Sequence, residues 1–328
     1  MQIKGKQFLV IGGAGFIGLQ IVEQLLKSGA RRVVIYDNFS RGSREALRAL
    51  TNDSRVEVFL GGADLLHKDM LQRAMKEIDG VFHLAAYWLL QCIEFPRAAF
   101  DVNIAGTMNV IEAALTEGVK RIVYSSSASV YGEPTSDLVS ESHPLNCTDI
   151  YGVSKACSEL LFKGMYAQQF VRNSGMDFVG LRYMNVYGKG QSASGDYISV
   201  VQRFLNAIEA GEQPCIYGDG MQSYDFVNVS DCARANILAM ETVHSNEFYN
   251  IGTGIGTSLL ALAKQMIALY GSNIQPAFID APREYIRNRI GATANAEKKL
   301  TYSSRITLED GLRELVSWRI SLKAPYNE

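Results

Sequence analysis

A tyrosine, a lysine and a run of serines have the types and spacing that the oxidation of an alcohol to a ketone requires. Tyr151 and Lys155 stand four residues apart, so a helix places both on one face. A tyrosine hydroxyl with a pKa near ~10 can act as a base at neutral pH when an adjacent ammonium group stabilises its ionised form. A serine of the run that ends at Ser127 can hold the substrate oxygen. The same pair is common on helix surfaces, so this interpretation requires a redox cofactor site elsewhere in the chain.

Strands and helices in alternation must position these groups. Short apolar runs, which favour buried strands, occupy residues 8–11, 33–36, 56–60, 81–84, 122–124 and 178–181. Helical patterns lie between them, the longest over residues 92–117 and 151–173. This alternation predicts an α/β fold with a doubly wound parallel sheet of the Rossmann type, in which ligands bind at the carboxyl ends of the strands. The serines and Tyr151 would then meet at the carboxyl ends of the strands.

A glycine-rich turn follows the first predicted strand and opens a helix. Gly13-x-Gly15-x-x-Gly18 has the dinucleotide-binding spacing, and Gly12-x-x-Gly15-x-x-Gly18 has a wider one. Glycines let the backbone approach a pyrophosphate, which the positive end of the helix attracts. Strand, glycine turn and helix in this order predict a dinucleotide site, and a plain turn is the weaker alternative.

An acid after the second predicted strand indicates which dinucleotide binds. Asp37 follows the apolar run 33–36, where a carboxylate can accept hydrogen bonds from both hydroxyls of an adenosine ribose. The same charge repels a 2′-phosphate, so the sequence favours NAD over NADP. Arg41 and Arg44 follow closely and weaken this preference slightly. A solvent-facing Asp37 is the alternative.

Three other polar residues lie at strand ends or in a helix, and each has two interpretations. Asp64 follows the third strand and can meet the adenine edge or cap a helix. His83 ends the fourth strand, where packing is a better interpretation than catalysis. Asn103 lies inside a predicted helix, where asparagine is disfavoured, so a buried hydrogen-bonding task competes with simple exposure.

The residue pattern changes after position 182. We predict an NAD-binding domain over residues 1–182, with a return at about 224–252, and a smaller mixed α/β substrate lobe from the rest of 183–328. Helices are expected at 197–210, 231–242 and 257–270, and strands at 215–217, 224–229 and 248–251.

Two later features could also bind phosphates. A second glycine cluster at 252–256 precedes a helix, but one dinucleotide site is already placed, so we interpret this cluster as a plain loop. Arg283, Arg287 and Arg289 form a basic stretch that suits either a diphosphate or a solvated surface.

The composition is ordinary for a globular chain. With 328 residues, 20% charged residues and a net charge of −2, it does not favour nucleic-acid binding. The first apolar run stops at Gly12, too early for a signal peptide, and no run approaches the roughly 20 apolar residues of a membrane span. The five scattered cysteines favour free thiols in a reducing cytoplasm. The four histidines lack ligand spacing, so no metal site is expected.

Taken together, these motifs resemble the extended short-chain dehydrogenases/reductases, and within them the NAD-dependent nucleotide-sugar epimerase/dehydratase family (UDP-galactose 4-epimerase-like). The resemblance covers essentially the whole chain. It rests on residues 12–18, 37–38, 83–86, 125–132, 151–155, 181–188, 218–223 and 250–254.

The resemblance implies a role for each site residue. Tyr151 would be the catalytic base, Lys155 would bind the nicotinamide ribose, and Ser127 would hydrogen-bond the reacting sugar oxygen. NAD would contact Gly12, Gly15, Phe16, Ile17, Asp37, Asn38, Ser40, Asp64, Leu65, Leu84, Ala85, Ala86, Asn103, Ser125, Tyr151, Lys155 and Tyr183. The substrate would contact Ser127, Asn185, Ile216, Tyr217, Tyr224 and Arg283. The resemblance also implies a homodimer formed through a four-helix bundle from residues 92–117 and 151–173.

The chain departs from the family pattern at three polar contacts. Trp88 replaces a lysine that contacts the cofactor, Tyr224 replaces an arginine that binds the diphosphate, and Ile286 replaces an acid near the nucleotide ribose. Arg287 or Arg289 could supply the missing charge. The catalytic half therefore matches the family more closely than the substrate half, and an unusual nucleotide is one explanation.

Three hypotheses for the function follow. The first is an NAD-dependent nucleotide-sugar 4-epimerase, with UDP as the expected nucleotide, that oxidises C4 transiently to a ketone. The second is a decarboxylase, dehydratase or 4-keto reductase of the same family. A 4,6-dehydratase would require an Asp-Glu pair where Ala128 and Ser129 stand, and a reductase would consume reduced cofactor. The third, a non-catalytic NAD-binding regulatory protein, is the least favoured because the catalytic trio is intact.

Overall fold

A seven-stranded parallel sheet forms the centre of the larger part of the molecule. The computed structural model describes residues 1–168, 170–193, 198–281 and 286–323. In sheet order the strands are β10 (Glu247–Ile251), β6 (Asp177–Tyr183), β5 (Arg121–Ser127), β4 (Gly80–His83), β1 (Gln7–Ile11), β2 (Arg32–Tyr36) and β3 (Val56–Val58). The strands are apolar along their length because helices cover both faces of the sheet. The prediction of a doubly wound parallel sheet is confirmed.

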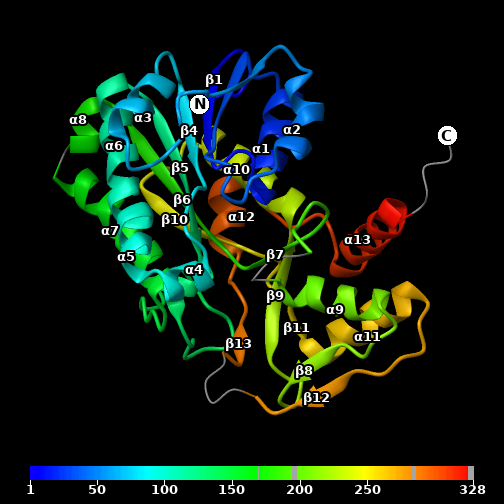
Figure 1. Ribbon diagram of the computed structural model, residues 1–328. Helices are drawn as coiled ribbons and strands as arrows, with labels where there is room; N and C mark the ends of the chain where they lie inside the picture. Colours follow the sequence, from blue (N-terminus) through cyan, green and yellow to red (C-terminus); the bar gives the residue numbers. More distant parts are fainter. Residues whose placement is uncertain (169, 194–197, 282–285, 324–328) are drawn as a thin grey trace.

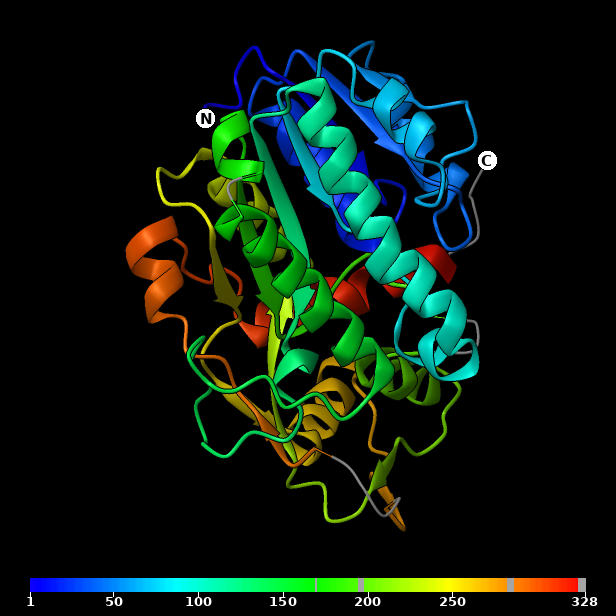
Figure 2. The same ribbon diagram turned by 90° about the vertical axis from the view of Figure 1, so that its left-hand side faces the viewer.

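Helices form a layer on each side of this sheet (Figure 1). One layer contains α1 (Phe16–Lys27), α2 (Arg44–Thr51), α10 (Val229–Glu241) and α12 (Ala294–Leu300). The other contains α3 (Lys68–Ala74), α6 (Gly106–Glu117), α7 (Ile150–Ala167) and α8 (Phe170–Ser174). Figure 2 shows α6 and α7 side by side across the sheet. Helix α1 buries Ile21, Val22 and Leu25, as expected for one apolar face of a helix.

A smaller lobe lies beyond the carboxyl ends of the strands (Figure 1). It contains a four-stranded sheet of β7 (Asn185–Tyr187), β9 (Ser223–Asn228), β11 (Gly256–Ser258) and β13 (Asn288–Arg289), and a pair formed by β8 (Cys215–Tyr217) and β12 (Ala277–Ile279). Helices α9 (Val200–Glu209), α11 (Leu259–Tyr270) and α13 (Leu308–Lys323) complete it. Within the expected return at 224–252, β9 belongs to the small sheet, whereas α10 and β10 lie with the large one.

The two longest predicted helices are divided in the structure. Residues 92–117 fall in α4 (Leu89–Glu94), α5 (Pro96–Ala99), a π-helical turn (Phe100–Ala105) and α6. The expectation of one continuous helix was wrong because Pro96 begins a new helix and cannot donate the backbone hydrogen bond that would continue the previous one. Residues 151–173 fall in α7 and α8, and residue 169 between them lies outside the described residues.

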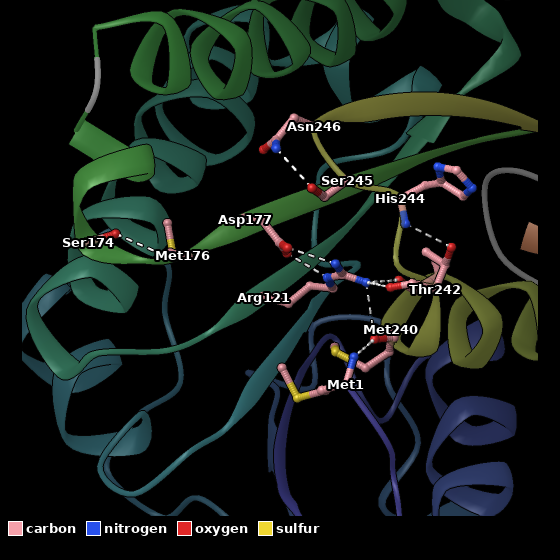
Figure 3. A network of polar contacts seen from close by, with 11 residues as sticks. Met1, Arg121, Ser174, Met176, Asp177, Met240, Thr242, His244, Ser245 and Asn246 are labelled. Atoms are coloured by element: carbon pink, nitrogen blue, oxygen red, sulfur yellow. Dashed lines mark hydrogen bonds and ion pairs between the residues drawn. The ribbon is translucent and has the colours of Figure 1, made fainter. Parts of the chain in front are cut away.

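A buried arginine holds together the amino ends of β5 and β6 and the end of α10 (Figure 3). Arg121 donates to the Asp177 carboxylate from Nε and Nη2, at 2.5 and 2.7 Å. Its Nη1 donates to the backbone carbonyls of Ala239, Met240 and Thr242. These carbonyls end α10, where a helix has no internal donors to offer. Arg121 therefore fixes β5, β6 and α10 to one another.

Candidate active site

A side-chain cap fixes the start of α7, and with it the position of Tyr151. The Asp149 carboxylate accepts a hydrogen bond from the Gly152 backbone N–H at 2.7 Å, which satisfies one of the free donors of the helix. Gly152 packs against the turn after β5, since a Cβ atom there would lie 2.5 Å from the Ser129 carbonyl oxygen. The start of α7 therefore lies beside the carboxyl end of β5.

Lys155 lies one turn further along α7 and is only 3% exposed. Its Nζ donates to the Ser125 carbonyl oxygen at 2.7 Å and lies 5.8 Å from the centroid of the Tyr151 ring. Burial lowers the pKa of this ammonium group to about 8, because a charge is less stable away from water. Lys155 is thus a cation at neutral pH, anchored to β5 and close to Tyr151.

The serines at the end of β5 face the same place. Ser127 is paired with Tyr183 of β6 in the strand register, and its Oγ accepts a hydrogen bond from the Ser129 backbone N–H at 3.1 Å. Ser125 Oγ lies 3.1 Å from the Tyr183 hydroxyl. That hydroxyl also accepts a hydrogen bond from Asn236 at 2.7 Å. The structure therefore brings Ser125, Ser127 and Tyr183 to the strand ends beside the start of α7.

The glycine turn between β1 and α1 has the close contacts that its glycines permit. Gly12 has a φ of +83°, which favours glycine, and a Cβ atom there would lie 2.8 Å from the backbone nitrogen of Ala85. A Cβ atom at Gly18 would lie 2.3 Å from the Gly12 carbonyl oxygen. Gly15 stands just before α1, so the backbone N–H groups that follow it can receive a phosphate. These observations fit a bound dinucleotide.

Asp37 holds the next part of this site in place. Its carboxylate accepts hydrogen bonds from the backbone N–H groups of Ala14 and Phe39, at 2.9 and 2.8 Å, and burial raises its pKa. A hollow of about 350 Å³ is lined by Asp37, Asn38 and Asp64, among others. One oxygen of Asp64 accepts the Leu66 backbone N–H at 2.9 Å. The hollow is suited to an adenosine because it combines carboxylates with apolar walls.

The other predicted cofactor residues have different surroundings. Phe16 and Ile17 form the first turn of α1, Leu84 and Ala86 flank Ala85 after β4, and Ser40 is exposed in the loop after β2. The Leu65 side chain is buried, and a Cβ atom at Gly106 would lie 2.8 Å from it. Leu65 is therefore a core residue through its side chain, and only its backbone could face a ligand.

Asn103 occupies the π-helical turn and binds the loop after β4. Its Oδ1 accepts the Tyr87 backbone N–H at 2.6 Å, and its Nδ2 donates to the Tyr87 carbonyl at 3.0 Å and to Ser154 Oγ at 2.9 Å. The buried hydrogen-bonding interpretation of Asn103 thus matches its position. His83 is buried beside Thr107, with 3.0 Å between Nε2 and Oγ1, and burial lowers its pKa to about 3.

A carboxylate already accepts hydrogen bonds from backbone N–H groups of the second glycine cluster, residues 252–256. Asp225 is fully buried, and its carboxylate accepts hydrogen bonds from the backbone N–H groups of Thr253 and Gly254, at 2.8 and 3.0 Å. It also accepts the Thr253 hydroxyl at 2.7 Å. A phosphate cannot take the same donors, because like charges repel and the donors are occupied. The cluster is a structural loop that joins β10 to the small lobe.

The described residues among the predicted substrate contacts lie in the small lobe, apart from Ser127. Asn185 opens β7, Tyr217 is 38% exposed at the end of β8, and the Ile216 side chain is buried in the lobe's core. The Tyr224 hydroxyl donates to the Ile286 carbonyl at 2.6 Å. Arg283 lies outside the described residues. Nearby, a hollow of about 90 Å³ is lined by Asp219, Met221, Gln222, Arg287 and Asn288.

A buried ion pair that the sequence did not predict lies beside β5. Arg182 of β6 donates to both oxygens of the Glu159 carboxylate, at 2.9 and 2.6 Å. Glu159 also accepts the Ser126 hydroxyl at 2.6 Å, and Arg182 donates to the Tyr131 hydroxyl at 2.8 Å. Glu159 follows Lys155 by four residues, which was the one available signal that it shares the buried face of α7.

Comparison with known proteins now identifies the family. Residues 8–252 match the family model described as the NAD dependent epimerase/dehydratase family. The chain belongs to this family. NAD is its cofactor, and the close contacts of the glycine turn and the hydrogen bonds of Asp37 fit a dinucleotide.

Three relatives show the range of this epimerase/dehydratase family. A UDP-N-acetylglucosamine 4-epimerase from Methanobrevibacter ruminantium, solved with UDP-N-acetylmuramic acid, is 33% identical with a TM-score of 0.89, over 97% of this chain and 99% of its own. A UDP-glucose 4-epimerase from Thermotoga maritima, solved with UDP-glucose, is 32% identical with a TM-score of 0.87, over 97% of this chain and 100% of its own. A UDP-N-acetyl-alpha-D-glucosaminuronate decarboxylase from Bacillus cytotoxicus is 30% identical, over 95% of this chain and 97% of its own.

The described part of this epimerase/dehydratase chain has neither a metal-binding cluster nor a membrane-spanning helix. Among the described residues, no group of three or more His, Cys, Asp and Glu side chains could hold a metal ion. Within the same ranges, no helix is long and apolar enough to cross a membrane.

Proposed function

We propose that this enzyme is a nucleotide-sugar 4-epimerase that acts on a UDP-sugar. The observation that carries the proposal is the convergence of Ser127, Tyr151 and Lys155 beside the dinucleotide turn. The end of β5 and the start of α7 meet through the contact of Gly152 with Ser129, and Lys155 is anchored on β5. Two similar solved structures are 4-epimerases by name, which supports the choice within the family.

Each residue of the trio has a distinct task in this proposal. Tyr151 removes the proton from the sugar 4-hydroxyl, and the Lys155 ammonium group stabilises the phenolate that does so. Ser127 hydrogen-bonds the 4-oxygen and orients the sugar. NAD, held by the glycine turn and Asp37, would supply the acceptor for the C4 hydride and would give it back. The 4-keto sugar turns over between these two events, so that Tyr151 returns the proton to the product of the opposite configuration, with no net oxidation.

The diphosphate of the substrate would meet a rearranged set of side chains in the small lobe. Tyr224 and Ile286, the two apolar or neutral replacements, contact each other. Arg289 pairs with Tyr224 in the register of β13 and β9 and donates to the Gly132 carbonyl at 3.3 Å. We propose that Arg289 supplies the positive charge that residue 224 lacks, and that Asn185 binds the same diphosphate. Arginine suits this task because it offers several donors to phosphate oxygens.

The experiment supplies the purified protein with UDP-glucose and UDP-N-acetylglucosamine and separates the C4 epimers by chromatography. We expect interconversion of at least one pair without added reductant. Tyr151→Phe should lower this rate by about 10²- to 10⁴-fold while the protein retains its NAD. Failure of every common C4 pair to interconvert would contradict the proposal.

A decarboxylase is the second candidate because one relative carries that name. UDP-N-acetylglucosaminuronate is therefore included in the same assay, and release of CO₂ from it would replace the epimerase assignment. Continuous consumption of NADH with a 4-keto sugar would instead indicate a reductase. Ala128 and Ser129 begin the 3₁₀ segment after Ser127, so the acid pair of a 4,6-dehydratase is missing there.

We also propose that the enzyme is a homodimer in the cytoplasm. Phe95, Phe100 and Leu160 lie on or beside α5 and α7 and are 51%, 49% and 57% exposed, and apolar side chains gathered in this way favour an interface. Light scattering should give twice the chain mass, and Leu160→Arg should give a monomer. The five cysteines are unpaired, which suits a reducing compartment.

A further inference from the structure

An ammonium group and a carboxylate lie one helical turn apart on the buried face of α7. Glu159 follows Lys155 by four residues, a spacing at which a base and an acid on a helix commonly pair. Glu159 is fully buried and Lys155 is 3% exposed, and opposite charges attract most strongly away from water. Among the described residues, however, the ion pair of Glu159 is with Arg182 and not with Lys155.

The two side chains bind neighbouring residues of β5 instead of each other. Lys155 Nζ donates to the Ser125 carbonyl at 2.7 Å, and Glu159 accepts the Ser126 hydroxyl at 2.6 Å. Both oxygens of Glu159 also accept hydrogen bonds from Arg182, from Nε at 2.9 Å and from Nη2 at 2.6 Å. A guanidinium group offers two parallel donors to a carboxylate, which an ammonium group cannot match. Glu159 is therefore held against β5 and β6.

Arg182 is anchored independently of Glu159. It is 2% exposed, and its Nη1 donates to the Tyr131 hydroxyl at 2.8 Å and to the Glu141 carbonyl at 3.1 Å. The Tyr131 hydroxyl donates in turn to Asn250 Oδ1 at 2.7 Å. Because these partners fix the guanidinium group from the side away from Glu159, the position of Arg182 determines where the carboxylate lies.

The other titratable groups around Lys155 do not compete for its charge. The Lys155 charge acts on His83 of β4 and Cys92 of α4, and its Nζ lies 5.1 Å from the centroid of the Tyr124 ring. Burial keeps all three uncharged at neutral pH, because it lowers the pKa of His83 to about 3 and raises the pKa of Cys92 and of Tyr124. Among these described neighbours, Glu159 is the one that carries a competing negative charge.

We propose that Arg182 is a positioning residue for the reaction: it holds the Glu159 carboxylate away from Lys155 and so leaves the ammonium charge available to Tyr151. A direct pair between Lys155 and Glu159 would cancel most of the charge that stabilises a phenolate beside it. Burial lowers the pKa of Lys155 to about 8 despite the carboxylate one turn away, as expected of an ammonium group without a direct ionic partner. This inference rests on the proposed roles of Lys155 and Tyr151.

The test follows the protonation of Lys155 by NMR in holoenzyme labelled with ¹³C at the lysine ε carbon, without sugar. The signal that Lys155→Met removes identifies the residue, and in the original protein it should titrate near pH 8. In Arg182→Met the released carboxylate should raise the titration midpoint by about 1–3 pH units, as an opposite charge nearby does. In the double variant Glu159→Gln/Arg182→Met the midpoint should return to near its original value, since the competing carboxylate is gone.

Two further variants separate this role from a structural one. Arg182→Lys keeps the charge but loses the paired donors, so it should raise the midpoint by less, and it also gives an answer if Arg182→Met does not fold. Arg121→Met is the matched control, because Arg121 is a second buried arginine, at the start of β5; it should leave the midpoint unchanged. The epimerisation rate should fall about tenfold or more in Arg182→Met and recover in the double variant, which a purely structural role of Arg182 does not predict.

The outcomes distinguish this inference from the proposed function. An unchanged Lys155 midpoint in both Arg182 variants would overturn the inference, and so would a double variant that titrates like Arg182→Met alone. The NMR measurement needs no sugar. The expected midpoints together with no epimerisation by the original protein would therefore contradict the proposed function only, whereas epimerisation with unchanged midpoints would contradict this inference only.

Discussion

A buried cation lies at each end of the central strands of the large sheet. The two cations differ in the number of hydrogen-bond partners that they have. Arg121, at the amino ends of the strands, is 5% exposed, and Lys155, beside their carboxyl ends, is 3% exposed. Arg121 faces the Asp177 carboxylate and three helix-terminal carbonyls. Among the described residues, Lys155 Nζ makes one hydrogen bond, to the Ser125 carbonyl. A fully paired charge fixes the fold, whereas a charge with unused donors is available to a ligand.

The pKa of Lys155 shows that its arrangement opposes stability. Burial lowers that pKa to about 8, so the folded protein holds this proton less tightly than the unfolded chain does. Sites that act on ligands commonly contain such perturbed groups. Burial alone therefore does not distinguish a structural cation from a candidate functional one, whereas the number of hydrogen-bond partners differs between Arg121 and Lys155.

Arg121→Met should have the largest effect on stability. The substitution leaves Asp177 and three carbonyls of α10 without their donor, and removal of one member of a buried pair destabilises by about 3–5 kcal/mol. Chemical denaturation should show this loss, and Arg121→Lys should show a smaller one because the charge remains. Activity per folded molecule should be unchanged, since Arg121 begins β5 and lies at the opposite end of that strand from Ser127.

Lys155→Met should change the stability of the fold in the opposite direction and make the protein more stable. A folded pKa near 8 instead of 10.5 means that the charge disfavours the folded state by about 3 kcal/mol at pH 7, at about 1.36 kcal/mol per pKa unit. The Ser125 carbonyl loses its donor, which offsets about 1 kcal/mol. We therefore expect the NAD-free variant to be about 2 kcal/mol more stable by denaturation, yet inactive. A destabilised variant would show that Lys155 resembles Arg121 after all.

The difference in stability between Lys155→Met and the original protein should depend on pH. Between pH 8 and 10.5 the unfolded chain retains the Lys155 proton and the folded protein does not, so the contribution of Lys155 to stability becomes less unfavourable as pH rises. Below pH 8 both states hold the proton and the contribution is constant. The stability gap between Lys155→Met and the original protein should therefore be widest below pH 8 and should narrow towards pH 10.5. Denaturation curves at four or five pH values give the result.

An exposed cation provides the smallest effect and calibrates the other two. Lys27 Nζ lies 2.6 Å from Glu23 Oε1 on α1, and the Lys27 and Glu23 side chains are 71% and 41% exposed. Exposed pairs at this spacing contribute about 0.3–0.5 kcal/mol. Lys27→Met should therefore change stability by less than about 0.5 kcal/mol, and a larger change would mean that removal of any lysine perturbs this fold.

The sequence predicted what depends on neighbouring residues. The run 33–36 became β2, the Tyr151 and Lys155 spacing became one face of α7, and the glycine turn has the backbone that its glycines require. Each of these follows from local periodicity or from the conformational freedom of glycine, which a single segment carries. The prediction of one helix over 92–117 was wrong because the helical periodicity continues through Pro96, whereas the backbone hydrogen bonding is interrupted there.

Tertiary structure alone decided the partners of the buried charges. Arg121 and Asp177 are 56 residues apart, Glu159 and Arg182 are 23 apart, and Arg41 meets Trp88 across β1. No periodicity connects such positions, because they are brought together by strand order and by the packing of helices on the sheet. The sequence by itself therefore determined which groups are the candidates for the chemistry, a tyrosine and a lysine one helical turn apart, and where the dinucleotide turn lies. The fold decided which charges are saturated and which remain available, because pairing depends on distance in space and not along the chain.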